Sequence, residues 1–183
     1  SGTKIAVGYA GQADWLVVST DGGVVVVSGK ADGLTVTKTL TSNGSDEFVV
    51  SFDNVRVAED DVLQGASPRR VNQLVLATIG AFAAGLVAGA LRLTADYVAT
   101  REQFGRPLST FQTVAAQLSE VYIASRTISL VATSAVWLLS QGGSADLDSD
   151  AEVDSELAVL GYWLTSQALP AMRTCHHLHG GMG

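Results

Sequence analysis

The sequence predicts an α+β protein in which an antiparallel β-barrel or sandwich unit is followed by a bundle of long helices. Two observations support this prediction. Short runs of β-branched residues separated by turn-forming residues fill the first third of the chain, and apolar residues at helical spacing fill the rest. The period changes near residue 65, where the polar connector AEDDVLQGASP contains a glycine and a proline. The predicted domains are therefore residues 1–64 and 65–183.

The first unit is predicted to contain five short strands. Runs such as VVVVS and LTVTKTL supply β-branched residues, and the segments TDGG, KADG and TSNGSD between them favour tight turns. Strands joined by tight turns indicate antiparallel pairing. The strands are expected near residues 3–9, 14–20, 24–28, 34–40 and 47–57.

Three long helices are predicted for the second unit. They cover residues 71–100, 110–141 and 150–177, with breaks at REQFGRPLS and GGSADLDS. In the second helix an apolar stripe recurs at helical spacing. Its members are Phe111, Val114, Leu118, Val121, Tyr122, Ser125 and Ile128. Either Ser109 or Thr110 is the predicted N-cap of this helix.

The first of these helices has no charged residue between Val71 and Leu91. That length could span a bilayer. However, the stretch is rich in Ala and Gly rather than Leu and Ile, and a polar β unit directly precedes it. We therefore predict the buried central helix of a soluble bundle and no membrane insertion. Four small residues would let a neighbouring helix or a bulky ligand approach closely: Ala81, Gly85, Ala88 and Gly89.

Composition excludes several function classes. The net charge is −7 and only eleven Lys and Arg are present, so binding to nucleic acid or to an acidic membrane surface is not expected. The single cysteine, Cys175, cannot form an internal disulfide, and no secretory signal begins the chain, so a cytoplasmic location is predicted. The chain has no initiator Met and stops at HGGMG. We therefore expect it to be part of something longer.

The segment CHHLHGGMG gathers all three histidines and the cysteine, with Cys175 and His179 one helical turn apart. Zinc requires four ligands, or three and an open position, and no second Cys/His cluster exists to complete a site. We predict no metal. The segment instead indicates a helix that ends in a glycine turn. Gly180, Gly181 and Gly183 would cap the helix or let a ligand approach the backbone closely. The residue inventory also permits a Ser-His-Asp or Cys-His hydrolase, but no G-x-S-x-G motif supports one.

The segment TREQFGRPLSTFQ, residues 100–112, resembles the R-x-x-F-G-x-P-L-x-x-F-Q signature of acyl-CoA dehydrogenases. In that family it lies between the first two helices of a C-terminal four-helix domain. SFDNVRVAEDDVLQG resembles the last strand of the family's middle β-domain and its exit, and LHGGMG resembles the end of its Q-x-x-G-G-x-G flavin motif. The resemblance covers nearly the whole chain. It implies that residues 1–64 are part of the middle β-domain and that residues 65–183 are a truncated C-terminal helical domain.

The resemblance implies FAD-dependent α,β-dehydrogenation of an acyl-CoA thioester by one subunit of a homo- or hetero-oligomer, a dimer of dimers. In the family the R-x-x-F-G loop of one subunit reaches the adenosine-diphosphate half of the neighbour's FAD. Arg101 would then place a forked cation on the pyrophosphate, Phe104 would pack near the dinucleotide, and Gln112 would offer amide hydrogen bonds. Gly105 and Pro107 would turn the chain.

In the flavin motif, Gly180 and Gly181 would be the paired glycines, whereas His177 stands where the family has glutamine. A histidine can still donate one hydrogen bond there.

The resemblance also raises a question about the catalytic base. Some members carry the glutamate that removes the α-proton on the first helix of this domain, and a gap-free alignment on R-x-x-F-G places Val75 at that position. Residues 71–95 contain no carboxylate. No catalytic residue is therefore predicted within this chain. The base either follows residue 183 or belongs to a partner, as in the hetero-oligomeric acyl-CoA dehydrogenases of actinobacterial steroid side-chain degradation, which this second arrangement resembles.

Two alternatives stay open. One is a different flavoenzyme on the same fold, such as an acyl-CoA oxidase or a nitroalkane oxidase. The other is a non-catalytic helical interaction module or membrane-dimerising segment, which predicts no flavin and dependence on detergent. In the simplest interpretation of the loop alone, Arg101 and Glu102 are solvated and Phe104 plugs the end of the bundle.

Overall fold

The computed structural model describes residues 1–141 and 147–182. Strands fill the first part of the chain and helices the second, which confirms the predicted α+β class. The chain divides into two compact units, Ser1–Val71 and Asn72–Gly183. Gly183, one of the glycines predicted to form the terminal turn, lies outside the described residues, as do residues 142–146 of the predicted GGSADLDS break.

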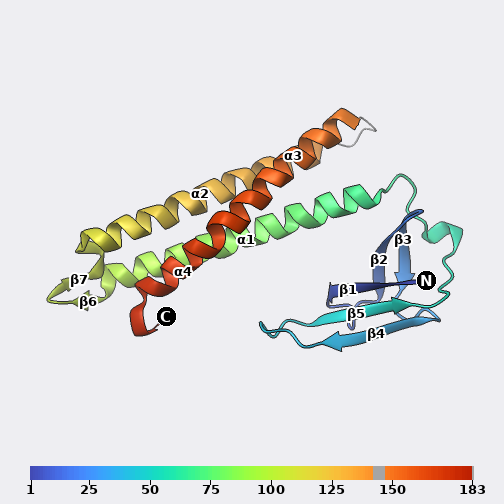
Figure 1. The fold of residues 1–183 in the computed structure, drawn as a ribbon, viewed down its shortest axis with the longest axis horizontal. Coiled ribbons are helices and arrows are strands. Elements are labelled where there is room, and N and C mark those ends of the chain that lie inside the picture. The colour runs from blue at the N-terminus through green and yellow to red at the C-terminus, as the bar shows by residue number, and fades with distance from the viewer. Residues whose placement is uncertain (142–146, 183) are drawn as a thin grey trace. The chain divides into compact units, whose positions relative to one another are not determined.

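The β unit contains all five predicted strands (Figure 1). They are β1 (Gly2–Gly8), β2 (Trp15–Thr20), β3 (Gly23–Ser28), β4 (Leu34–Thr39) and β5 (Glu47–Phe52). β1, β5 and β4 form a three-stranded antiparallel sheet, and β2 and β3 form a hairpin. The alternating apolar residues of these strands bury a small core, to which Leu16, Val27 and Val50 contribute.

The last strand is shorter than predicted. β5 ends at Phe52 rather than near residue 57, because the chain leaves the sheet there. The Asp53 amide donates to the Gly33 carbonyl oxygen at 2.9 Å, and Asn54 takes a positive φ of 51°. Asparagine tolerates this left-handed conformation better than most residues. The β-branched residues that follow, Val55 and Val57, therefore lie outside the sheet in the exit segment.

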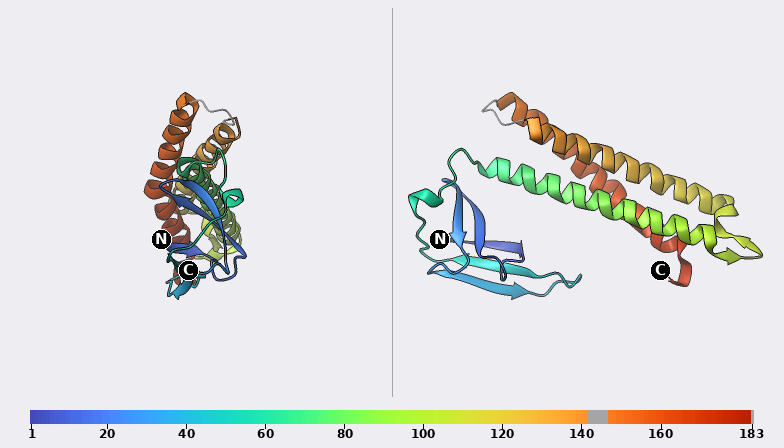
Figure 2. Two further views of the ribbon diagram at one scale, coloured as in Figure 1. Left: turned by 90° about the vertical axis from the view of Figure 1, so that its right-hand side faces the viewer. Right: turned by 180° about the vertical axis from the view of Figure 1, so that it is seen from behind.

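Three long helical rods form the second unit, as predicted (Figures 1 and 2). The first two are α1 (Pro68–Thr100) and α2 (Gln112–Gln141). The third consists of α3 (Leu147–Trp163), a π-helical turn (Leu164–Ala168) and α4 (Leu169–Leu178). Pro170 accounts for the π turn, since proline has no amide to bond the Ser166 carbonyl and its ring crowds that oxygen.

The start of α2 differs from the prediction. The Thr110 hydroxyl donates to the Pro107 carbonyl at 2.7 Å within a short 3-10 turn, Leu108–Thr110. Phe111, in an extended conformation, directly precedes α2, and its carbonyl accepts from the Ala115 amide at 3.0 Å. Neither Ser109 nor Thr110 is therefore the N-cap. The predicted apolar stripe is buried only in part. Val121, Ser125 and Ile128 are buried, Phe111, Val114 and Leu118 are half-buried, and Tyr122 is exposed.

The predicted burial of α1 at the centre of a bundle is wrong for this chain. One face of α1 packs against the other helices through Ala77, Gly80, Ala84 and Val87, which we call the packed face. The opposite side, which we call the open face, exposes large apolar side chains. Its residues are Val75, Ile79, Phe82, Leu86 and Leu93. The helices α2, α3 and α4 cover only one side of α1.

Close packing of α1 depends on a glycine that the sequence did not single out. A Cβ atom at Gly80 would overlap Leu160 Cδ2, whereas a Cβ at Gly85 or Gly89 would meet nothing within 4 Å. By length and composition, α1 and α2 could each cross a bilayer, but core helices of soluble proteins pass the same test.

Candidate functional site

The segment between α1 and α2 is an ordered β-hairpin rather than an irregular loop. β6 (Glu102–Gln103) pairs with β7 (Arg106–Pro107), and the Leu108 amide donates to the Arg101 carbonyl at 2.8 Å. The two residues of the turn, Phe104 and Gly105, have φ values of 54° and 79°. Two successive positive φ angles are typical of a type I′ turn. Gly105 therefore turns the chain as expected, but Pro107 lies in a strand and Phe104 shares the turn.

The backbone of Phe104 is strained in this turn. A non-glycine residue held at positive φ costs about 1–3 kcal/mol. Its side chain is 92% exposed, so it does not plug the end of the bundle, and that part of the simplest interpretation is wrong. Arg101 and Glu102 are exposed, as the same interpretation expected. It makes one edge-to-face contact with Phe111, with ring centroids 6.3 Å apart. Strain combined with exposure of a large apolar ring makes this hairpin a candidate binding surface.

Arg106 and Phe111 form a second contact at the base of the hairpin. The Arg106 guanidinium lies 4.1 Å from the centroid of the Phe111 ring, within cation–π range. Phe111 therefore contacts both Phe104 and Arg106, and it leads directly into α2. The sequence placed Phe111 in the apolar stripe of the second helix and gave no sign of its contact with Arg106, because no spacing rule pairs the two residues.

The other predicted site segment is the turn after α4. α4 ends at Leu178, and Gly180 takes a φ of 62° before a 3-10 turn, Gly180–Met182. This confirms the predicted helix end in a glycine turn. A Cβ at Gly180 or Gly181 would meet nothing within 4 Å, so the backbone there is open to a ligand. His177 is exposed on the last turn of α4.

Contacts between α4 and α1 bring the two segments to the same end of the helical unit (Figures 1 and 2). The His179 ring stacks on Tyr97 with centroids 4.4 Å apart and an interplanar angle of 20°. Tyr97 lies one turn before Arg101, where the hairpin begins, and the Arg101 amide donates to its carbonyl at 2.8 Å. The glycine turn and the hairpin therefore belong to one end of the bundle.

All six predicted site residues lie at this end, in elements that the fold brings together. They are Arg101, Phe104, Gln112, His177, Gly180 and Gly181. Five of them lie in the hairpin segment or at the end of α4. The sixth, Gln112, is the exposed first residue of α2. The first amides of a helix have no intrahelical partner and favour anions. Two exposed cations, Arg101 and Arg106, flank the same helix start.

The open face of α1 carries no acid–base group at the position that the resemblance assigns to the catalytic glutamate of some family members. Val75 is 49% exposed on that face. No carboxylate occurs between residues 71 and 95, so this part of α1 cannot remove a proton.

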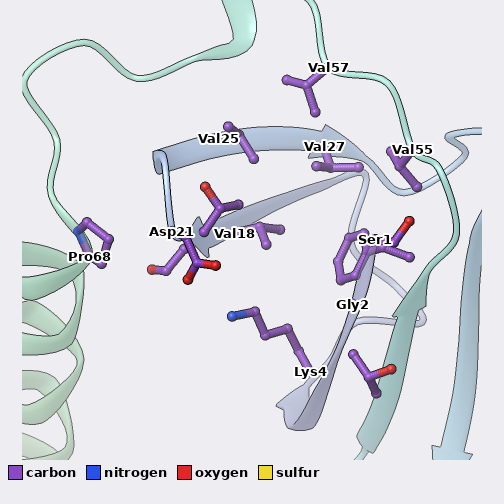
Figure 3. Close-up of a pocket in the computed structure, with 14 residues that line it drawn as sticks. Ser1, Gly2, Lys4, Val18, Asp21, Val25, Val27, Val55, Val57 and Pro68 are labelled. Carbon is purple, nitrogen blue, oxygen red and sulfur yellow. The ribbon is translucent and has the colours of Figure 1, made fainter.

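The hollows of the described units include an apolar groove and a more polar cavity. An apolar groove of about 490 Å³ lies between the end of α1 and the start of α2, lined among others by Leu91, Leu118 and Tyr122. A cavity of about 460 Å³ lies within the β unit, where Lys4 and Asp21 extend toward each other (Figure 3). Neither is lined by a predicted site residue. Among residues 1–141 and 147–182, no group of three or more His, Cys, Asp or Glu side chains is placed to hold a metal ion.

Comparisons with known proteins concern both units. Residues 77–183 match the family model described as "Acyl-CoA dehydrogenase, C-terminal domain". The chain is 64% identical over 183 residues to the acyl-CoA dehydrogenase FadE28 of Mycobacterium tuberculosis, covering 100% of this chain and 52% of that protein. The chain spans about half the length of the curated relatives it matches.

Two solved structures match this chain over nearly its whole length. The crystal structure of the ChsE4–ChsE5 complex from Mycobacterium tuberculosis has a TM-score of 0.84 and 28% identity, over 98% of this chain and 48% of that one. A variant of the steroid ACAD Tcur3481–Tcur3483 has a TM-score of 0.84 and 28% identity, over 100% of this chain and 48% of that one.

Proposed function

Because this chain belongs to the acyl-CoA dehydrogenase family, we propose that it is a subunit of an oligomeric FAD-dependent enzyme that oxidises the α,β bond of an acyl-CoA thioester. The observation that carries the proposal is the strained hairpin, which exposes Phe104 beside Arg101 at the end of the bundle where the glycine turn also lies. Such a surface suits a ligand that combines phosphates with flat rings.

The residues present fit the adenosine-diphosphate half of FAD. Arg101 offers five donors in a planar fork for a pyrophosphate, and the first amides of α2 favour the same negative charge. Phe104 offers a ring face to the dinucleotide, and Gln112 offers amide hydrogen bonds. The open backbone at Gly180 would allow close approach.

The other proposed contacts with FAD come from the turn after α4. His177 and Gly181 would donate from this turn to the same cofactor. When bound, the flavin supplies the acceptor for the hydride that leaves the substrate. This chain's own residues would bind and orient it.

We further propose that the chain is the subunit without a catalytic base, paired with a catalytic partner. This rests on Val75 and on the absence of a carboxylate from residues 71–95. The ChsE4–ChsE5 structure is described as a complex of two proteins, and the Tcur3481–Tcur3483 protein as a steroid ACAD. These descriptions support a hetero-oligomer that acts on a steroid acyl-CoA. We propose that the assembly is a dimer of dimers and that its reaction belongs to the β-oxidation of a steroid side chain, within lipid metabolism.

The open face of α1 would be covered by a neighbouring subunit in this assembly and not by lipid. It has no basic residue between Val71 and Leu91 to meet an acidic headgroup, and the chain carries a net charge of −7. We therefore propose a cytoplasmic protein without membrane insertion and without a nucleic-acid partner.

The test of cofactor binding is Arg101→Ala in the assembled protein. We expect FAD retention to weaken by about 1.5–3 kcal/mol, the scale of a charge-assisted hydrogen bond. Flavin content after gel filtration and the FAD dissociation constant measure this. Arg126→Ala is the matched control, since Arg126 is an exposed arginine in the middle of α2. Equal flavin loss in both variants, or in neither, would contradict the assignment of Arg101.

The test of the base-less arrangement uses the protein and its partner separately and mixed. The protein purified alone should not oxidise any acyl-CoA, and mixing should give activity that a substitution of the partner's glutamate abolishes. Val75→Glu here should restore little, because the thioester would not be placed against it. Robust dehydrogenation by this protein alone would move the base to a segment after residue 183. A flavin that reduces oxygen during turnover would instead indicate an oxidase.

A further inference from the structure

One side-chain cluster at the bundle end has no role in the proposed cofactor contacts. It lies where the end of α4 meets α1 and centres on His179. Besides its stack on Tyr97, the His179 ring places Nε2 3.3 Å from Thr94 Oγ1. The Tyr97 hydroxyl donates to the His179 backbone carbonyl at 3.4 Å. One residue at the end of α4 therefore makes three contacts with the last two turns of α1.

The hydrogen bond between Thr94 and His179 has a defined direction. Thr94 Oγ1 donates its only proton to the Ala90 carbonyl at 2.8 Å. A hydroxyl has one proton and two lone pairs, so Oγ1 must accept from His179, and Nε2 carries the proton. Thr94 is 1% exposed, in surroundings where an unpaired donor would be costly. The pair of contacts therefore fixes both the plane and the orientation of the imidazole.

His179 is also the last residue with a side chain before the two open glycines. It is the C-cap of α4, with φ −77° and ψ −11°, and Gly180 then takes a φ of 62°. Gly180 and Gly181 have no side chains that could hold the turn in place. The contacts of His179 therefore hold the residue directly before the turn against α1.

We propose that His179 is a positioning residue that pins the glycine turn to α1. Because of its contacts, one preformed surface would face the ligand. This surface would combine the backbone of Gly180 and Gly181 with the hairpin that starts at Arg101. The inference rests on the proposed function, because the ligand concerned is FAD. His179 itself would act through the turn and not by touching the cofactor.

Pinning has a measurable consequence for affinity. When only a fraction of molecules has the turn in place, the apparent dissociation constant rises by the inverse of that fraction. Loss of a ring stack together with a hydrogen bond is enough to change such a fraction by about tenfold. We therefore expect His179→Ala to weaken FAD binding about tenfold in the assembled protein.

The experiment compares four variants of the assembled protein at a temperature well below unfolding. They are His179→Ala, Thr94→Val, Thr94→Ser and His176→Ala. Flavin fluorescence gives the FAD dissociation constant, and amide hydrogen exchange at residues 179–182 is measured without added FAD. Thr94→Val keeps the shape but removes the acceptor, so it should weaken binding several-fold. Thr94→Ser keeps the acceptor and should bind as the unsubstituted protein does. His176, exposed one turn away, is the matched control for His179 and should change neither measurement.

The results separate the inference from the function on which it rests. Faster exchange in the His179→Ala turn with unchanged FAD affinity would overturn the positioning role while leaving the flavin site intact. Equal weakening by Thr94→Val and Thr94→Ser would overturn the role of the directed hydrogen bond. If His179→Ala does not fold, the Thr94 pair still decides. Failure of the unsubstituted assembly to bind FAD would overturn the proposed function itself, before any variant is compared.

Discussion

The two faces of α1 use apolar residues of opposite size. The packed face presents small residues, Ala77, Gly80 and Ala84, to the neighbouring helices. The open face presents large ones such as Phe82 and Leu86, which remain more than half exposed. Hydrophobicity alone cannot tell these faces apart, because both are apolar. Side-chain size does, because helices approach closely only over small residues.

The comparison is tested most strongly by two leucine truncations. Leu160 is 1% exposed and packs over Gly80, so Leu160→Ala should lower the free energy of unfolding by about 2–5 kcal/mol. Leu86→Ala, on the open face, should change it by less than about 0.5 kcal/mol in this chain. Urea denaturation followed by circular dichroism measures both. A large loss for Leu86→Ala would show that the open face is already covered in the isolated chain.

The same logic predicts that the open face matters only once the protein assembles. Phe82 is 68% exposed here, so Phe82→Ala should leave the stability of the isolated chain nearly unchanged. In the assembled protein, where we propose that the face is covered, the truncation should cost about 1.5–3 kcal/mol. Light scattering on dilution measures subunit dissociation. Identical dilution curves with and without the substitution would place Phe82 outside every interface.

Sequence patterns located the elements of the fold but not the environment of α1. Alternating β-branched runs placed five strands, and helical spacing placed three rods, within a few residues of their bounds. The uncharged stretch from Val71 to Leu91 then suggested burial on every side. That inference failed because how many neighbours a helix has is a property of the tertiary structure, and periodicity carries no signal when both faces are apolar.

A matched pair of glycine substitutions probes the two faces at nearly constant chemistry. Gly80→Ala should destabilise by about 1–3 kcal/mol through overpacking against Leu160, in spite of the better helix propensity of alanine. Gly85→Ala, whose Cβ would meet nothing within 4 Å, should stabilise by about 0.5–1 kcal/mol. Thermal unfolding of the two variants gives the sign directly. Two stabilised variants would mean that Leu160 moves aside and that the packed face is less closely packed than described.

The sequence predicted the residues of the candidate site but not the tertiary contacts between them. Motif residues Arg101, Gly180 and Gly181 could be located from the string alone, because the resemblance fixes their positions. The contacts that bring them to one end could not, since His179 reaches Thr94 across 85 residues of sequence. The left-handed conformation of Phe104 also left no trace in the sequence, because a type I′ turn normally shows itself by Asn or Gly at that position.

Phe104 differs from the residues on both faces of α1, because it is apolar, almost fully exposed and also strained. Phe104→Asn should therefore stabilise the chain by about 0.5–1 kcal/mol, because asparagine followed by Gly105 suits a type I′ turn. The loss of the edge contact with Phe111 offsets part of the gain. Thermal unfolding without FAD measures the stability, and FAD retention in the assembled protein should fall in the same variant. Gly105→Ala is the control, since it adds strain at a φ of 79° and should destabilise. A Phe104→Asn variant that loses stability would show that the ring packs within the chain, and one that keeps full FAD affinity would show that the exposed ring serves another partner.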